Sequence, residues 1–455
     1  MKTTINKILI FTAVAAATLP TFTSCSQDES IDERLSSGAI AFNMVLDHSN
    51  AQNRPTGTRA ASGTKVMDNN SFTNFRVWAY DAQVLGTVTE GNTISNGGAM
   101  YMGSTNAAGV LIKRSDNNTT GTNGYQFGTQ TSAGKYWGYD EVSDVKYWPK
   151  NYLQFFAIGP NGIDNITYSM PATYSGTNTF TYTADASALS NHKDIIVAAK
   201  RQAGSIGRHN VDLTFKHALS QVIFLGKVVA NQPKLNVRIY SVSLCNVNKT
   251  ATFTFPLETN GDLSSLAQTN WGTPSVSSTY IIQPKSGETT NYIELTANED
   301  ATQDGTTVSL MNGGSSLENN GSFLNDDPLF LIPQTVSKWD YSTNYDDGNN
   351  AIVNEGTNDT GKADGSQTGA YLKINCAIYQ VAGVPIVGSY SGDSYTGEDV
   401  YVPLDVNWNP GTKYVYTLNF GIRRNVYGVP LGAPITFSVS SVTDWGTPSS
   451  SNVSL

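Results

Sequence analysis

The sequence predicts an all-β protein built from β-sandwiches, and three observations support this prediction. Of the 455 residues only 14% are charged and 10% are aromatic, while Gly, Ser, Thr and Asn are abundant. Short segments alternate between apolar and polar residues, which indicates strands with one buried face. The sequence contains no long stretch with the spacing of an amphipathic helix. This profile is typical of extracellular proteins rich in strands and turns.

The beginning of the chain predicts export. An apolar core at residues 8–19 follows two lysines, which suits a secretory signal and is too short to span a bilayer. The small residues before Cys25 resemble the lipobox that lipoprotein signal peptidase reads. We therefore expect residues 1–24 to be removed and Cys25 to carry acyl chains that hold the protein on the outer membrane. Ordinary secretion with a spare cysteine is the alternative.

One neatly alternating strand follows the predicted anchor. Ile40, Phe42, Met44 and Leu46 would lie on one face of this strand. Burying these four side chains would stabilise the fold by about 6 to 12 kcal/mol, as an upper bound. Whole domains are stable by only about 5 to 15 kcal/mol. Removal of the strand without replacement would leave an apolar groove and an unpaired edge, which another strand would fill.

Arg59 is the predicted cleavage site. It precedes Ala60 in a Gly- and Thr-rich linker, and proteases find flexible backbone in such linkers. Arg54 is followed by proline, which arginine-directed proteases handle poorly, and a cut at Arg34 would leave the strand attached. The alternative is that Arg59 is an ordinary linker residue, and the protein then stays tethered and closed.

Further strands are predicted along the rest of the chain, and the expected domains follow from them. Alternating segments recur at residues 74–80, 152–158, 211–215, 414–420 and 435–439. About 430 residues remain after cleavage, which is more than one core usually serves. A polar stretch at residues 201–210 is the expected boundary. The predicted units are a signal peptide at 1–24, a propeptide with a removable strand at 25–59, and β-sandwiches at 60–207 and 208–455.

Several motifs, taken in order, resemble the fimbrillin family of Bacteroidota. They are Tyr147-Trp148-Pro149, the apolar runs at 153–157 and 194–199, the segment 211–220, Leu331-Ile332-Pro333, residues 408–416 and the near-terminal segment 435–445. The resemblance covers most of the mature chain. It implies a subunit of a type V pilus, with two tandem transthyretin-like β-sandwich domains. It further implies export as a lipoprotein, maturation by an arginine-specific protease and polymerisation by strand exchange with copies or paralogues, for adhesion.

A second alternating segment near the C-terminus is a candidate donor strand for such an exchange. Ile435, Phe437 and Val439 give it an apolar face. The polar tail beyond it is short. A stalk subunit needs both a groove and a donor, whereas a tip subunit needs only the groove, so stalk, tip and anchor roles all stay open.

No cofactor, metal ion or nucleic acid is expected as a partner. The net charge of −9 opposes nucleic-acid binding, which needs a basic surface. An acidic stretch at residues 346–364 lacks the spaced ligands of a calcium loop. His217 falls on the apolar side of its strand and is expected to be a core histidine. Trp148, Trp408 and Trp445 are expected to pack in the core rather than to form sugar platforms.

The sequence leaves alternatives open for the two remaining cysteines and for the class of function. Cys245 and Cys376 are either two buried free thiols or one disulfide. The protein is either a pilus subunit or an outer-surface lipoprotein that binds a glycan or a protein partner. An enzyme is not expected, although an acidic pair for glycoside hydrolysis is defined only in space and so cannot be read from sequence spacing.

Overall fold

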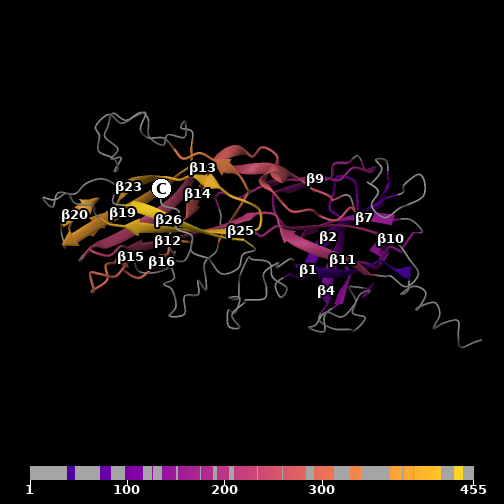
Figure 1. Ribbon diagram of the computed structural model, residues 1–455, viewed down its shortest axis with the longest axis horizontal. Coiled ribbons are helices and arrows are strands. Elements are labelled where there is room, and N and C mark those ends of the chain that lie inside the picture. Colours follow the sequence, from indigo (N-terminus) through magenta and orange to yellow (C-terminus); the bar gives the residue numbers. More distant parts are fainter. Residues whose placement is uncertain are drawn as a thin grey trace, which may run out of the picture.

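The computed structural model describes residues 38–46, 72–82, 98–115, 125–126, 136–149, 152–174, 176–187, 192–203, 210–232, 234–258, 260–282, 292–311, 328–339, 369–381, 384–392, 394–421 and 435–443. These residues are mostly in strands, accompanied by two short 3-10 helices, η2 (Val142–Asp144) and η4 (Gln268–Trp271). The prediction of an all-β fold is confirmed. The molecule is elongated, with the strands of the N-terminal half at one end and most strands of the C-terminal half at the other (Figure 1).

The N-terminal half forms a nine-stranded sheet. Across this sheet the order is β1 (Ala41–Leu46), β11 (Asn210–His217), β10 (Ile196–Ala203), β7 (Tyr152–Gly159), β2 (Asn74–Asp81), β4 (Val110–Ser115), β6 (Tyr136–Tyr139) and β5 (Tyr125–Gln126), and β3 (Met100–Met102) also pairs with β2. Strand β1 runs parallel to β11, whereas the other pairs of this sheet are antiparallel. The segments predicted at 74–80, 152–158 and 211–215 are therefore β2, β7 and β11.

The C-terminal half contains two larger sheets. One has the order β16 (Val308–Ser309), β12 (Ser220–Val228), β25 (Thr412–Phe420) and β26 (Ile435–Thr443), and β17 (Leu329–Leu331) pairs with β12. The other has the order β20 (Val384–Val387), β19 (Tyr371–Val381), β13 (Asn236–Thr254), β9 (Thr179–Thr183) and β8 (Ile166–Ser169), with β14 (Ser275–Ile282) and β15 (Ile293–Thr296) on β13 and β23 (Glu398–Pro403) on β19. Side chains of both sheets share one apolar core. Two small ladders join β18 (Thr335–Val336) to β24 (Val406–Asn407) and β21 (Ser389–Ser391) to β22 (Ser394–Thr396).

Strand β13 connects the two halves. It is 19 residues long, and its last five residues pair with β9, which comes from the N-terminal half of the chain. The same apolar core includes residues of β2 and β7, and the ring of Phe156 lies 5.2 Å from that of Phe255. The two halves therefore share both a hydrogen-bonded ladder and a packed core.

The loop after β13 reaches back to the nine-stranded sheet. The amide of Leu263 donates to the carbonyl of Ala199 at 3.1 Å, and Gln154 Nε2 donates to the carbonyl of Gly261 at 2.8 Å. Gly261 has a φ of +84°, and a Cβ there would lie 2.4 Å from Gln154 Oε1 and 2.5 Å from Arg201 Cβ. Only glycine fits this contact without displacing its neighbours.

The expected domain boundary between residues 207 and 208 falls between β10 and β11. These strands are neighbours in one sheet, and Ile196 pairs with His217. A boundary just after His217 keeps the nine-stranded sheet whole, because the chain then passes to β12 in the other half. We propose this position for the division, with β8 and β9 as an arm that the first unit contributes to the second.

The two described cysteines are free and buried. They lie on neighbouring strands, but Cys376 is opposite Ile239 whereas Cys245 is opposite Tyr371, five residues before Cys376 in β19. Five positions along a strand correspond to roughly 17 Å, and a disulfide needs Cα atoms within about 7 Å. The alternative of a disulfide between them is therefore wrong.

We expect both thiols to resist modification in the folded protein. Burial raises the pKa of Cys376 to about 12 and also raises the pKa of Cys245, so neither supplies the reactive thiolate. In protein lacking Cys25, an aromatic disulfide reagent should titrate no thiol under native conditions and two thiols after denaturation without a reductant. Two native thiols, or none after denaturation, would contradict this expectation.

Candidate functional site

The site of interest is the groove that β1 fills in the nine-stranded sheet, close to the N-terminal end of the described chain. Ala41 to Leu46 pair in parallel with Asn210 to Phe215 of β11. Ile40, Phe42 and Leu46 are at most 1% exposed and belong to the core of this half, and Met44 is half-buried against the same core. The four residues predicted to share one face therefore all contact the same apolar core.

Phe42 is the anchor of this strand. Its ring lies 5.8 Å from Phe75, 6.1 Å from Tyr139 and 6.0 Å from Phe155, in each case edge to face. Such edge-to-face pairs stabilise a contact beyond its burial of area. The three partners come from β2, β6 and β7, so one side chain of β1 joins three strands of the sheet.

The start of β1 also contacts the segment that follows β6. The amide of Ile40 donates to the carbonyl of Lys146, and the amide of Trp148 donates to the carbonyl of Gly38, both at 2.8 Å. Tyr139 Oη donates to the carbonyl of Ile40 at 2.9 Å. Strand β1 thus lies between β11 on one side and the segment after β6 on the other, and it closes the curled sheet.

A polar side-chain contact between described residues lies on the other face of β1. Asn43 Nδ2 donates to Asp212 Oδ1 at 3.0 Å, and these two residues are directly opposite in the parallel register. Ala39 and Ala41, which the alternation places on this face, are nevertheless buried. The small side chains of Ala39 and Ala41 allow neighbouring residues to pack closely against this face as well.

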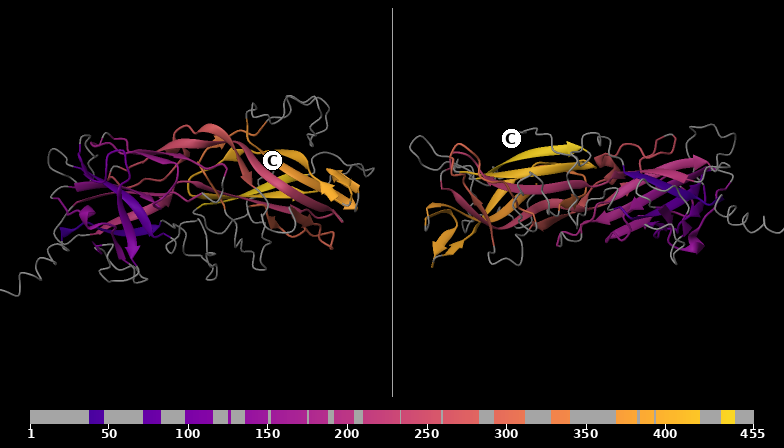
Figure 2. Two further views of the ribbon diagram at one scale, coloured as in Figure 1. Left: turned by 180° about the vertical axis from the view of Figure 1, so that it is seen from behind. Right: turned by 90° about the horizontal axis from the view of Figure 1, so that it is seen from below.

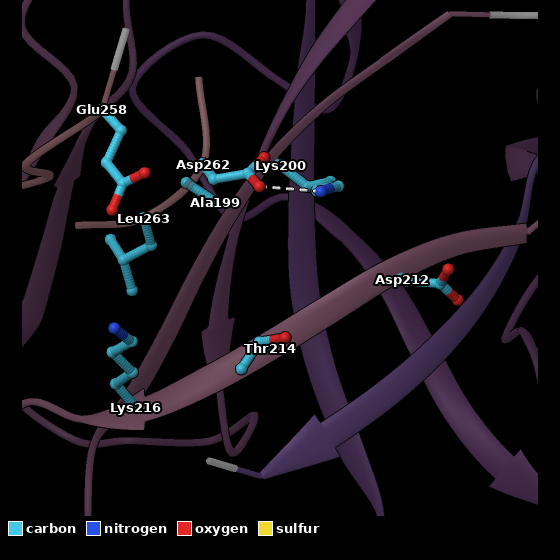
Figure 3. A pocket seen from close by; sticks show the side chains of 8 residues that line it. All are labelled: Ala199, Lys200, Asp212, Thr214, Lys216, Glu258, Asp262 and Leu263. Carbon is cyan, nitrogen blue, oxygen red and sulfur yellow. Dashed lines mark hydrogen bonds and ion pairs between the residues drawn. The ribbon is translucent and has the colours of Figure 1, made fainter. Parts of the chain in front are cut away.

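A hollow of about 230 Å³ lies beside this contact, on the outer face of β10 and β11 (Figure 3). Asp212, Thr214 and Lys216 line it from β11, and Glu258 and Asp262 line it from the loop after β13. Lys200 Nζ lies 2.8 Å from Asp262 Oδ2. Three carboxylates and two lysines line the hollow, so it offers a polar rim along β11 with a slight excess of negative charge.

The candidate donor segment with Ile435, Phe437 and Val439 is strand β26. It pairs antiparallel with β25 from Phe420 opposite Ile435 to Thr412 opposite Thr443. It ends the order of its sheet, and no other described strand pairs with it. In all views β26 lies in the opposite half of the molecule from β1 (Figures 1 and 2). The donor candidate is therefore an edge strand that does not meet the groove within one molecule.

Several predicted features lie outside the described residues. They are the lipidation site Cys25, the processing site Arg59 and Ala60, the acidic stretch 346–364 and Trp445. Within the described ranges no group of three or more His, Cys, Asp and Glu could hold a metal ion. The same ranges contain no helix that is long and apolar enough to cross a membrane.

Of the side chains predicted to belong to the core, Trp408 and His217 are buried and Trp148 is partly buried against it. Trp408 is buried and its Nε1 donates to Tyr416 Oη at 2.9 Å, while Trp148 packs edge to face on Phe155 at 5.8 Å. His217 is buried, and its Nδ1 lies 2.7 Å from Asp194 Oδ2. The sequence did not indicate this carboxylate partner, because Asp194 lies 23 residues earlier and opens an apolar run.

Comparison with known proteins identifies the family. Residues 58–445 match the family model described as fimbrillin-like. The chain belongs to the fimbrillin-like family. The resemblance drawn from the motifs is thus confirmed, and the fimbrillin-like match begins after β1. Proteins of the fimbrillin-like family are structural proteins and not enzymes.

Solved structures similar to this fimbrillin-like chain come from species of Bacteroides and Parabacteroides. A fimbrial protein of Bacteroides vulgatus is 15% identical, with a TM-score of 0.45 over 90% of this chain and 99% of that chain. A candidate cell adhesion protein of Bacteroides eggerthii is 10% identical, with a TM-score of 0.39 over 90% and 96%. A candidate cell adhesion protein of Parabacteroides distasonis is 8% identical, with a TM-score of 0.38 over 90% and 97%. A search of curated proteins returned no match.

Replacement of Phe42 by Ala should strongly destabilise the uncut protein. It removes a buried ring and leaves a cavity among three aromatic residues, which typically costs about 3 to 5 kcal/mol. Asn43→Ala, in the same strand, should cost only about 0.5 to 1.5 kcal/mol because it removes one partly exposed hydrogen bond. Urea unfolding of both variants measures the difference, and equal losses would show that Phe42 does not anchor β1.

The closure of the sheet should weaken at alkaline pH. Burial raises the pKa of Tyr139 far above its ordinary value of 10.0, so the folded state binds this proton more tightly than the unfolded chain does. The resulting stability is fully present below pH 10 and is lost as the pH rises above it. Unfolding measured between pH 8 and 11.5 should show this decline.

Two single substitutions test whether Tyr139 causes part of the alkaline decline. Tyr139→Phe should make the loss of stability above pH 10 shallower, because the titrating phenol is gone. Tyr147→Phe, at an exposed position on the adjoining segment, is the matched control for the loss of a phenolic hydroxyl. Identical slopes in both variants and the wild type would mean that Tyr139 does not contribute to the decline.

Proposed function

We propose that this protein is a structural subunit, stalk or tip, of a type V pilus, and that it assembles by exchanging β1 for a strand of a neighbouring subunit. Membership of the fimbrillin-like family supports a pilus or adhesin subunit. The observation that carries the finer proposal is the position of β1. It ends the order of its sheet yet fills the aromatic core, and Arg59 lies in the sequence between β1 and β2.

A cut after Arg59 would turn β1 into a separate peptide held only by non-covalent contacts. Loss of Ile40, Phe42 and Leu46 would then expose their places in the core, at roughly 1.5 to 3 kcal/mol for each side chain. The edge of β11 would also lose its partner. A domain that is stable by about 5 to 15 kcal/mol tolerates this poorly, so the emptied groove favours the entry of another strand.

Strand exchange of this kind would build a filament. The groove and the donor candidate β26 are on different halves of the molecule, so each subunit would fill the groove of one neighbour and have its own groove filled by another. Such a contact joins unlike surfaces and does not close on itself, and it therefore propagates. As an edge strand, β26 would give up one ladder on leaving its sheet.

The proposed maturation has two steps, lipidation at Cys25 and cleavage after Arg59. Cys25 would carry the lipid after lipoprotein signal peptidase has acted, and an arginine-specific protease would then cut between Arg59 and Ala60. The anchor and β1 would be removed together, because both precede the cut. The protein would pass from an outer-membrane lipoprotein precursor to the cell-surface fimbrium. The start of the family match at residue 58 is consistent with a mature chain that begins near Ala60.

Limited proteolysis tests this function. Lipid-free protein treated with a trace of trypsin should be cut at Arg59 and should then form oligomers that resist mild detergent. Mass spectrometry locates the cut, and size-exclusion chromatography follows the oligomers. Arg59→Gln should stay uncut at this position and monomeric.

Two outcomes would contradict assembly by exchange of β1. Degradation without a discrete product would show that the linker is not a processing site. A protein cut at Arg59 that remains a stable monomer would instead favour an outer-surface lipoprotein that binds a glycan or a protein partner.

A further inference from the structure

The candidate donor strand repeats the pattern of the strand that it would replace. Residues 40–44 read Ile-Ala-Phe-Asn-Met, and residues 435–439 read Ile-Thr-Phe-Ser-Val. The isoleucine and the phenylalanine are identical at the same spacing, and a third apolar residue follows. In both segments a polar residue comes directly after the phenylalanine.

We propose that the groove vacated by β1 selects this pattern, so that β26 of a second copy enters with Phe437 in the place of Phe42 and Ser438 opposite Asp212. The inference rests on the proposed strand exchange. It adds the register of the incoming strand and the groove residues that determine it.

The aromatic site fixes the register. The rings of Phe75, Tyr139 and Phe155 surround the position of Phe42 at 5.8 to 6.1 Å, whereas the position of Met44 is half-buried. A slip by one residue turns the apolar face outward. A slip by two residues places Ile435 or Val439 among the three rings, and either side chain leaves part of a phenylalanine-sized space empty.

Backbone contacts at the start of the groove, where Ile40 lies, further disfavour the slip that moves Ile435 to the place of Phe42. In the proposed register Ile435 takes the place of Ile40, whose amide donates to Lys146 and whose carbonyl accepts from Tyr139. If Ile435 moved to the place of Phe42, Pro434 would occupy the place of Ala41 inside the strand. Proline has no N–H to donate and is poorly tolerated within a sheet.

The outer face of the groove selects the residue after the phenylalanine. Asp212 Oδ1 accepts a hydrogen bond from Asn43, so a replacing strand satisfies this carboxylate best with a donor at that point. The hydroxyl of a serine is such a donor. An acidic residue would place two carboxylates side by side across the strands, which is destabilising. The match between the apolar patterns of the two segments ends at Ser441, a polar residue that would take the place of the buried Leu46.

Paired cysteines test the register. Protein lacking Cys25 and carrying Asp212→Cys with Ser438→Cys is cut with trypsin, allowed to assemble and oxidised. Directly opposed residues in neighbouring strands lie within disulfide range, so covalent ladders should appear on non-reducing gels. Asp212→Cys with Thr436→Cys is the matched control, because Thr436 would be opposite Asp212 only after the two-residue slip. We expect roughly tenfold less cross-linking in the control, since diagonal neighbours are about 7 to 8 Å apart.

The outcomes separate this inference from the function on which it rests. If cut wild-type protein forms no oligomers, strand exchange fails and the register falls with it. If oligomers form and the Thr436 pair cross-links better, or neither pair cross-links, the register is wrong while strand exchange stands. Covalent oligomers from the Asp212→Cys and Ser438→Cys pair alone support the proposed register.

A peptide assay covers the case in which loss of Asp212 weakens assembly. A peptide of residues 434–442, added to cut wild-type protein, should occupy the groove and inhibit oligomer formation. Phe437→Ala in this peptide should weaken inhibition by roughly tenfold or more, because a buried phenylalanine is worth about 1.5 to 3 kcal/mol. Thr436→Ala should change it little. Equal effects of the two substitutions would overturn the proposed register.

Discussion

The packing of Phe42 among Phe75, Tyr139 and Phe155 is the interaction on which the N-terminal half depends. The strands of these three rings, β7, β2 and β6, are not neighbours of β1 in the sheet order, and their rings reach Phe42 because the sheet curls until its two sides approach β1. Strand β11 presents Val211, Leu213 and Phe215 to the same core. The sheet is complete only while some strand occupies the place of β1, and this requirement links the stability of the fold to the proposed assembly.

The rest of the molecule is built to keep the two halves together. Strand β13 belongs to the C-terminal half and ends on β9, and the following loop is held against β7 and β10 through Gly261 and Leu263. His192 adds a buried contact, since its Nδ1 accepts from the amide of Phe330 of β17 at 3.2 Å. A shared core and a shared ladder resist bending between the halves.

Much of this architecture could be predicted from the sequence, because period-two alternation is a local signal. It located β2, β7, β11, β25 and β26, and it identified Ile40 and Phe42 as inward-facing. The partners of these strands could not be predicted. Ala41 pairs with Asn210, and His217 meets Asp194, and such contacts depend on how distant segments meet rather than on local spacing. The hydrogen bond from Tyr139 to the carbonyl of Ile40 could not be predicted for the same reason, because the sequence around a tyrosine does not indicate which distant carbonyl accepts its proton. The boundary expected before β11 was based on the polar composition of residues 201–210. The boundary that we propose after His217 is based instead on the pairing of β10 with β11.

The parallel direction of β1 on β11 has a consequence for any assembly that uses this groove. A strand that runs antiparallel would pair with β11 in a different hydrogen-bond pattern, so a segment that reproduces the contacts of β1 points the same way as β1. In the proposed assembly every junction would have the same orientation, and the fibre would be polar, with two different ends. One end of such a fibre would display an unused β26 and the other an unfilled groove, so the two ends would differ in how they grow and how they are capped.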